Sequence, residues 1–219
     1  MHQAAEPRTG HDGGADHYIL IARILSPLIE TRVIFRFGFL VQSGDFAIEL
    51  VRPTDFQARQ YVENLTGLGI YLLKKVPLFI LAWAAFGLQV PSNPAAWGAF
   101  AISLVLGWSA LFFFDWIFAC LAFYSTETWG LSVVRVGTAT FFSGALVPLA
   151  MMPAWLQQVA AALPFAQALA VPTSFLSGVT PVTDAPRVWL IQLLWLVGLF
   201  GLSRWIFSLA VRKVTVQGG

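Results

Sequence analysis

Residues 43–63 read SGDFAIELVRPTDFQARQYVE, and we call this stretch the polar segment. It carries six charged side chains in 21 residues, at positions 45, 49, 52, 55, 59 and 63, with Arg52-Pro53 near its centre. After it the chain turns apolar almost to its end. This contrast is typical of a segment that lies outside the bilayer and connects to helices that lie within it.

The composition of the whole chain indicates a membrane protein. Of its 219 residues, 58% are hydrophobic and 11% are charged, whereas a soluble domain carries about 25% charged residues. Residues 76–114 and 136–183 contain no charge at all. Since about 20 apolar residues are enough for one helical crossing, the sequence predicts an all-α polytopic membrane protein.

Four apolar stretches are predicted to cross the bilayer: residues 65–89, 97–123, 130–149 and 188–211. Residues 17–39 are apolar but interrupted by charges and a proline, so a crossing and an interfacial helix both stay open. About five transmembrane helices are therefore expected within a membrane domain of residues 17–219. Residues 1–16 lack an apolar core and are expected to form a disordered tail.

Prolines at 148, 153, 164, 172, 181 and 186 break the apolar stretch before the last span. Because proline interrupts helices, we expect a re-entrant helical hairpin there. Nine lysines and arginines would share the side of the polar segment, against Arg187 alone in the proline-rich stretch. The positive-inside rule then places the polar segment in the cytoplasm and the hairpin outside the cell.

Enzymatic motifs are missing from the sequence. It has no GxxxxGK[ST], HExxH or GxSxG pattern, and its three histidines all lie within residues 1–17. We therefore expect no catalytic residue, no metal ligand set and no resident cofactor. The basic residues do not cluster as a nucleic-acid-binding patch would require.

Three charged residues lie within or beside predicted spans. Asp115 follows three phenylalanines; an acid there is a functional candidate, but we expect it near the cytoplasmic interface, either partnered or hydrated. Glu127 and Arg135 flank the start of the third predicted span. A solvated interfacial position is expected for both, and pairing with neighbouring elements is the alternative.

The polar segment also contains large apolar residues, at positions 46, 48, 50, 51 and 56. A loop that only connects two helices does not need them, whereas a short amphipathic helix that docks into a partner's groove does. A hydrated loop and a docking helix both remain open on composition alone.

Three stretches stand out in order along the chain: GDFAIELVRPTDFQ (44–57), YSTETWGL (124–131) and FFSGALVPLAMMPAWLQQVAAALPF (141–165). Together they resemble an export-type ABC permease family related to the ABC type-2 transporters. The resemblance implies a permease subunit of the cytoplasmic membrane that works as a homo- or heterodimer with two separate ATPase subunits, which bind the ATP. It also implies extracellular re-entrant helices before the last span.

In that family a cytoplasmic coupling helix docks on the ATPase. By position it corresponds to residues 44–59, which gives as site residues Gly44, Asp45, Glu49, Arg52, Pro53 and Asp55. Asp115, Glu127 and Arg135 are candidates for structural or gating roles. Family members usually carry a complete first span before the region that begins here at Tyr18. Either the sequence starts too late to include that span, or the protein lacks it.

The leading hypothesis is a non-catalytic permease subunit of an ABC exporter. A membrane scaffold that recruits a different cytosolic partner through residues 43–63 is the main alternative. An intramembrane enzyme that uses Asp115 or Glu127 is a third.

Overall fold

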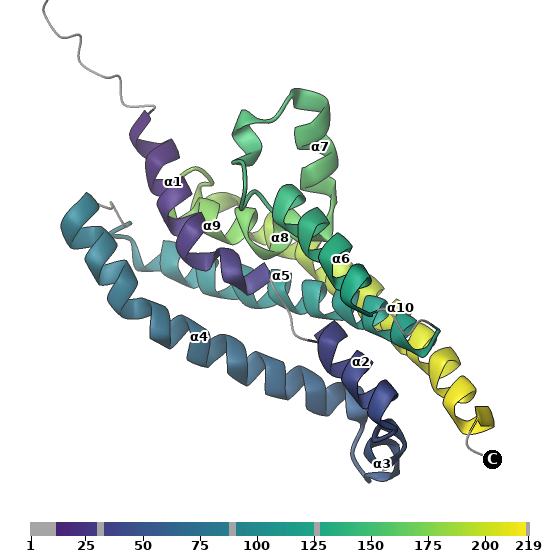
Figure 1. The fold of residues 1–219 in the computed structure, drawn as a ribbon. Helices are drawn as coiled ribbons and strands as arrows, with labels where there is room; N and C mark the ends of the chain where they lie inside the picture. The colour runs from purple at the N-terminus through teal and green to yellow at the C-terminus, as the bar shows by residue number, and fades with distance from the viewer. Residues whose placement is uncertain (1–11, 30–32, 88–90, 125–127, 218–219) are drawn as a thin grey trace, which may run out of the picture.

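A computed structural model describes residues 12–29, 33–87, 91–124 and 128–217, and the regular elements in these ranges are all helices. They fold as one bundle (Figure 1). In chain order, with η for a short 3-10 helix, they are α1 (Asp12–Leu25), η1 (Ser26–Ile29), α2 (Val33–Ser43), α3 (Phe46–Val51), α4 (Phe56–Phe86), α5 (Pro94–Cys120), η2 (Leu121–Phe123), α6 (Thr128–Phe142), η3 (Leu149–Met151), α7 (Ala154–Ala162), α8 (Pro164–Ala168), α9 (Ala170–Leu176), η4 (Val182–Asp184) and α10 (Ala185–Gln217).

Helix α5 is the centre of the bundle. It packs against α2, α8, α9 and α10, and 67% of its most apolar stretch is buried. The corresponding fractions for α4 and α10 are 11% and 17%. Since the outer faces of α4 and α10 are apolar and exposed, these two helices present the surface that a bilayer would cover.

Three helices are long and apolar enough to cross a membrane, over 56–85, 94–123 and 182–212. A fourth crossing is obtained only if α7 and the α8–α9 pair, which meet at a 69° bend, count as one broken span. The described part of the chain thus offers three or four spans, whereas the sequence predicted about five.

The third predicted span, residues 130–149, is the clearest difference. Helix α6 has 15 residues, which corresponds to about 22 Å and is short of the ~30 Å hydrocarbon core. Its continuation bends away through Gly144, whose φ of +81° lies in the left-handed region. Residues 17–39 likewise divide between α1 and α2, so no single described helix crosses there.

The first long helix begins earlier than expected. Helix α4 starts at Phe56, so the last part of the polar segment forms its first two turns. Lys74 lies 18 residues after Phe56, about 27 Å along the axis. Helix α1 also begins within the expected tail, since Asp12–Asp16 are helical.

Helices α5 and α8 approach each other closely at Gly107. A Cβ built on Gly107 would lie 1.9 Å from the backbone oxygen of Gln167, so only glycine fits. Beside it, the buried amide of Gln192 on α10 donates to Ser103 Oγ at 2.8 Å and to the Gln167 carbonyl at 3.0 Å. Small residues and buried polar contacts of this kind hold helices together inside membranes.

Candidate functional site

The turn into α3 is fixed by two of the predicted coupling residues, Gly44 and Asp45. Gly44 has φ +80°, a conformation that glycine adopts without steric cost. Asp45 precedes α3, accepts a hydrogen bond from Ser43 Oγ at 2.8 Å, and its carbonyl accepts from the backbone N–H of Glu49 at 3.2 Å. Together they determine where α3 begins and how it departs from α2.

Two phenylalanines of the polar segment anchor α3 inside the bundle. Phe46 and Phe56 are almost fully buried, and their ring centroids lie 5.2 Å apart. They belong to an aromatic cluster of residues 37, 46, 56, 116, 123 and 207. Full burial of one phenylalanine side chain contributes about 1.5–3 kcal/mol. These two rings therefore stabilise the chain itself and do not face a partner. They are not part of a docking surface, which the apolar residues of the polar segment had suggested.

The opposite face of α3 is exposed. Ile48 is 63% exposed and Val51 is 85% exposed, and Arg52 and Pro53 beside them are also exposed. We call these four residues the α3 tip. In Figure 1 the α3 helix lies at the lower end of the molecule, the same end as the C-terminus of α10, while α7 lies at the upper end. The α3 tip combines apolar side chains with one cation at an extremity of the bundle.

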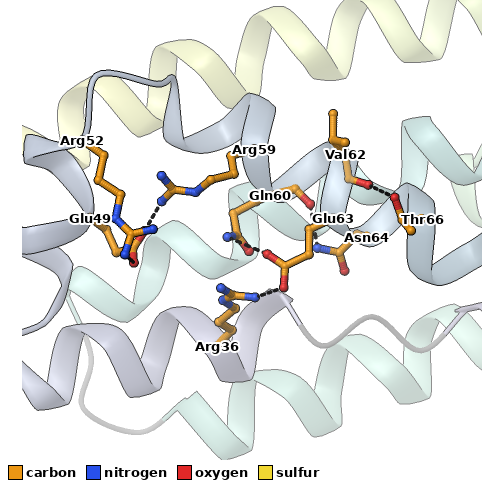
Figure 2. A network of polar contacts seen from close by, with 9 residues as sticks. All are labelled: Arg36, Glu49, Arg52, Arg59, Gln60, Val62, Glu63, Asn64 and Thr66. Carbon is orange, nitrogen blue, oxygen red and sulfur yellow. Dashed lines mark hydrogen bonds and ion pairs between the residues drawn. The ribbon is translucent and has the colours of Figure 1, made fainter.

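Glu49 connects α3 to α4. Its carboxylate pairs with the guanidinium of Arg59 and, at 3.4 Å, with that of Arg52 (Figure 2). Glu49 is mostly buried, whereas the Arg52 side chain is more than half exposed. Arg59 also donates to Thr54 Oγ1 at 3.2 Å and lies 5.4 Å from the Phe56 ring centroid. Glu49 therefore holds α3 against α4 from inside the bundle, while Arg52 remains accessible at the α3 tip.

Asp55 begins α4 and joins it to α10. Its Oδ1 accepts from the backbone N–H of Ala58 at 2.8 Å, as an N-cap residue does. Its Oδ2 accepts from Arg204 Nη1 at 2.6 Å. Partial burial alone would raise the pKa of Asp55, but the hydrogen bonds from Ala58 and Arg204 outweigh it and hold the pKa below its usual value.

Arg204 is the site residue that the sequence analysis missed. It lies inside the predicted last span. A cation in a span requires a partner or a position at the interface, so its position in the sequence could have identified Arg204 as a candidate. Next to it, the buried side chain of Gln57 donates to Ser203 Oγ at 2.8 Å. The start of α4 is thus bound to α10 by both an ion pair and a buried hydrogen bond.

A further ion pair joins α2 to α4. The guanidinium of Arg36 pairs with the carboxylate of Glu63, which also accepts from Gln60 at 3.3 Å (Figure 2). Both side chains of the pair are about half exposed, so its contribution to stability is small. The ion pair instead orients α4, because it holds the charged face of α4 toward α2.

Asp115 and Arg135 form a buried ion pair between α5 and α6. The two side chains are 0% and 1% exposed. Arg135 Nε pairs with Asp115 Oδ1, Nη2 donates to Oδ2 at 2.6 Å, and Nη1 donates to the carbonyl of Ile29 in η1. The expected solvated position of Arg135 is therefore wrong. Asp115 is partnered, as one of the expectations had it, but it is buried rather than hydrated.

The candidate residues thus form two groups, and Glu127 lies outside the described residues. One group, at the start of α3 and α4, contains Gly44, Asp45, Glu49, Arg52, Pro53 and Asp55. The other is the Asp115–Arg135 pair. The aromatic cluster lies between them, since it includes Phe46 of α3 and Trp116, the neighbour of Asp115, with Phe37 in contact with both at 5.7 and 4.7 Å.

The described residues form a helical bundle whose outer helices are apolar and long enough to cross a bilayer, which indicates a multi-pass membrane protein. The family described as ABC-2 family transporter protein matches residues 17–218. The chain belongs to this family and is an ABC transporter membrane subunit. No curated protein and no solved structure matches it.

Proposed function

We propose that the chain is the permease subunit of an ABC exporter in the cytoplasmic membrane, driven by a separate ATPase that docks on the α3 tip. The observation that supports this proposal is that α3 has one buried face and one exposed face. Its inner face is fixed by Phe46 and by the Glu49–Arg59 pair, and its outer face exposes Ile48 and Val51. A loop without a partner would not combine a rigid base with exposed apolar residues at its end.

The contacts of α3 suit it to transmit a displacement. The Glu49–Arg59 pair ties α3 to α4, and the Asp55–Arg204 pair ties the start of α4 to α10. The aromatic cluster connects α3 to α5 through Phe37 and Trp116. Because packed protein interiors deform little, movement of α3 by a partner would be passed to three long helices at once.

In the proposed cycle, ATP closes the ATPase pair and moves the coupling helices of two permease subunits. The bundle then shifts between states that bind and release the substrate with different affinity. ATP is bound by the partner, and the permease holds no cofactor of its own. The bent α7–α9 region forms the outward re-entrant hairpin in this arrangement, opposite α3.

The test compares two valine substitutions. Val51→Asp places a charge on the α3 tip, and Val179→Asp places one at a position of comparable exposure, 64%, outside the α3 region. We expect Val51→Asp to reduce co-purification of the ATPase by roughly tenfold, which corresponds to the loss of one interface contact of ~1.4 kcal/mol. Val179→Asp should leave co-purification unchanged.

Arg52→Ala should weaken the same association, because its guanidinium is exposed beside Val51. Equal recovery of the ATPase with Val51→Asp, Val179→Asp and the unmodified chain would refute docking on the α3 tip. Recovery through the α3 tip of a protein that does not hydrolyse ATP would instead support the scaffold hypothesis.

A further inference from the structure

A groove of about 540 Å³ lies between α4 and α10, with α5 contributing to its wall. Its volume falls within the ~300–1,000 Å³ that is usual for sites of small organic molecules. Its walls are apolar for most of their area and consist of Ala58, Tyr61, Phe113, Leu196, Val197 and Phe200.

The groove lies between two candidate spans, away from the charged face that α4 turns toward α2 and α3. The charged residues of α4 nearest to it are turned elsewhere, since Arg59 pairs with Glu49 of α3 and Glu63 pairs with Arg36 of α2. On the α10 wall, by contrast, Val197 remains 66% exposed. Lipid chains surround the exposed faces of membrane spans, so we expect an acyl chain to occupy an apolar groove there.

The length of α10 places the groove in one leaflet when Ala185, the first residue of α10, is taken as the outer edge of the hydrocarbon core. Arg204 lies 19 residues after Ala185 on α10, about 29 Å along the axis and close to the ~30 Å thickness of the hydrocarbon core. Leu196, at the far end of the groove, lies eight residues before Arg204, about 12 Å deeper and within a half-thickness of ~15 Å. The groove therefore extends into the leaflet on the α3 side.

The polar rim of the groove is Asp55, Gln57 and Arg204. It carries one negative and one positive side chain, so its formal charge is zero. Among the described residues, Arg204 forms hydrogen bonds through Nη1 alone, to Asp55 and to Gln57, which leaves Nη2 and Nε for a phosphate. A carboxylate has about four acceptor positions, so Asp55 can also accept from an ammonium group.

We propose that this groove binds one zwitterionic phospholipid of the leaflet next to α3, with an acyl chain along Leu196–Phe200, its phosphate on Arg204 and its amine on Asp55. The site lies where α4 is tied to α10, so the headgroup shares the two side chains that join these helices. The proposal does not depend on which partner binds the α3 tip.

The test uses the full chain in vesicles of phosphatidylethanolamine and phosphatidylglycerol, with a trace of phosphatidylethanolamine that carries a photoreactive acyl chain. Adducts are mapped by mass spectrometry. Val197→Trp fills the groove, and Leu194→Trp is its matched control, because Leu194 is 67% exposed on the same helix but does not line the groove. Arg204→Gln removes the phosphate contact.

We expect adducts between residues 196 and 204, reduced roughly tenfold by Arg204→Gln because a charge-assisted hydrogen bond is lost. Val197→Trp should reduce them similarly and Leu194→Trp should not, and unlabelled phosphatidylethanolamine should compete better than phosphatidylglycerol. Equal reduction by both tryptophan variants, or equal competition by both lipids, would overturn the proposal, as would adducts that join two copies of the chain at this groove. These adducts are measured without the ATPase, so a negative result here is distinct from a negative result in the co-purification of the ATPase with the Val51→Asp variant.

Discussion

Replacing Arg135 with methionine removes one partner of the buried ion pair between α5 and α6 and leaves the carboxylate of Asp115 in an apolar interior. Breaking a fully buried pair from one side costs about 3–5 kcal/mol. Asp115→Leu should cost a similar amount, because it leaves the guanidinium buried without its carboxylate.

The double variant separates the pair from its surroundings. Replacement of both charges by apolar residues of similar size is often neutral, but here the carbonyl of Ile29 also loses the donor Arg135 Nη1. An unsatisfied buried acceptor costs about 1–3 kcal/mol. We therefore expect the double variant to lose about 1–3 kcal/mol, less than either single variant.

The assay is equilibrium unfolding in mixed micelles by increasing the fraction of denaturing detergent, followed through tryptophan fluorescence. The signal is the sum of nine tryptophans, and it includes Trp116, which is buried directly beside Asp115 and should change its emission when this region unfolds. Single variants that each cost under about 1 kcal/mol, with a double variant equal to their sum, would contradict a tightly coupled pair.

Two further predictions concern packing and charge. Gly107→Ala should destabilise the protein by about 1–3 kcal/mol or more through overpacking against Gln167. Gly98→Ala on the same helix, where a Cβ meets open space, should be neutral or stabilising by up to about 1 kcal/mol. Thermal unfolding measures both variants, and equal effects would refute the close approach of α5 and α8 at Gly107. Asp55→Asn keeps an N-cap residue but removes the exposed pair with Arg204, so it should cost about 0.2–1 kcal/mol at neutral pH. The pKa of Asp55 is lowered in the folded protein. The stability difference between the unmodified protein and Asp55→Asn should therefore be fully present above the ordinary pKa of 3.8 and disappear as the pH falls through the lowered pKa. A stability difference that does not change with pH would contradict this prediction.

The sequence predicted those parts of the fold that depend on local composition. The span that became α5 was placed at 97–123 and the last span at 188–211, close to the observed 94–123 and 182–212. The start of α5 carries such a local signal, since Asn93 caps the helix by accepting from the backbone N–H of Ala95 at 2.9 Å. Long apolar runs and capping residues are local signals, so they can be read without a structure.

What the sequence could not predict depends on contacts between distant residues. Asp115 and Arg135 are 20 positions apart on different helices, and no spacing pattern indicates that they meet. Arg204 and Asp55 are 149 positions apart. The sequence also could not show that Phe46 and Phe56 point inward while Ile48 and Val51 point outward, because that division depends on how α3 is rotated against the bundle.

The proposed contact between a separate ATPase and the α3 tip can be trapped with a photoreactive amino acid at Ile48, cross-linked in native membranes, and the attached protein can be identified by mass spectrometry. We expect an adduct with a P-loop ATPase that is lost when Val51→Asp is combined with the probe. An adduct with a protein that has no ATPase domain, or an ATPase that co-purifies without cross-linking at Ile48, would contradict it.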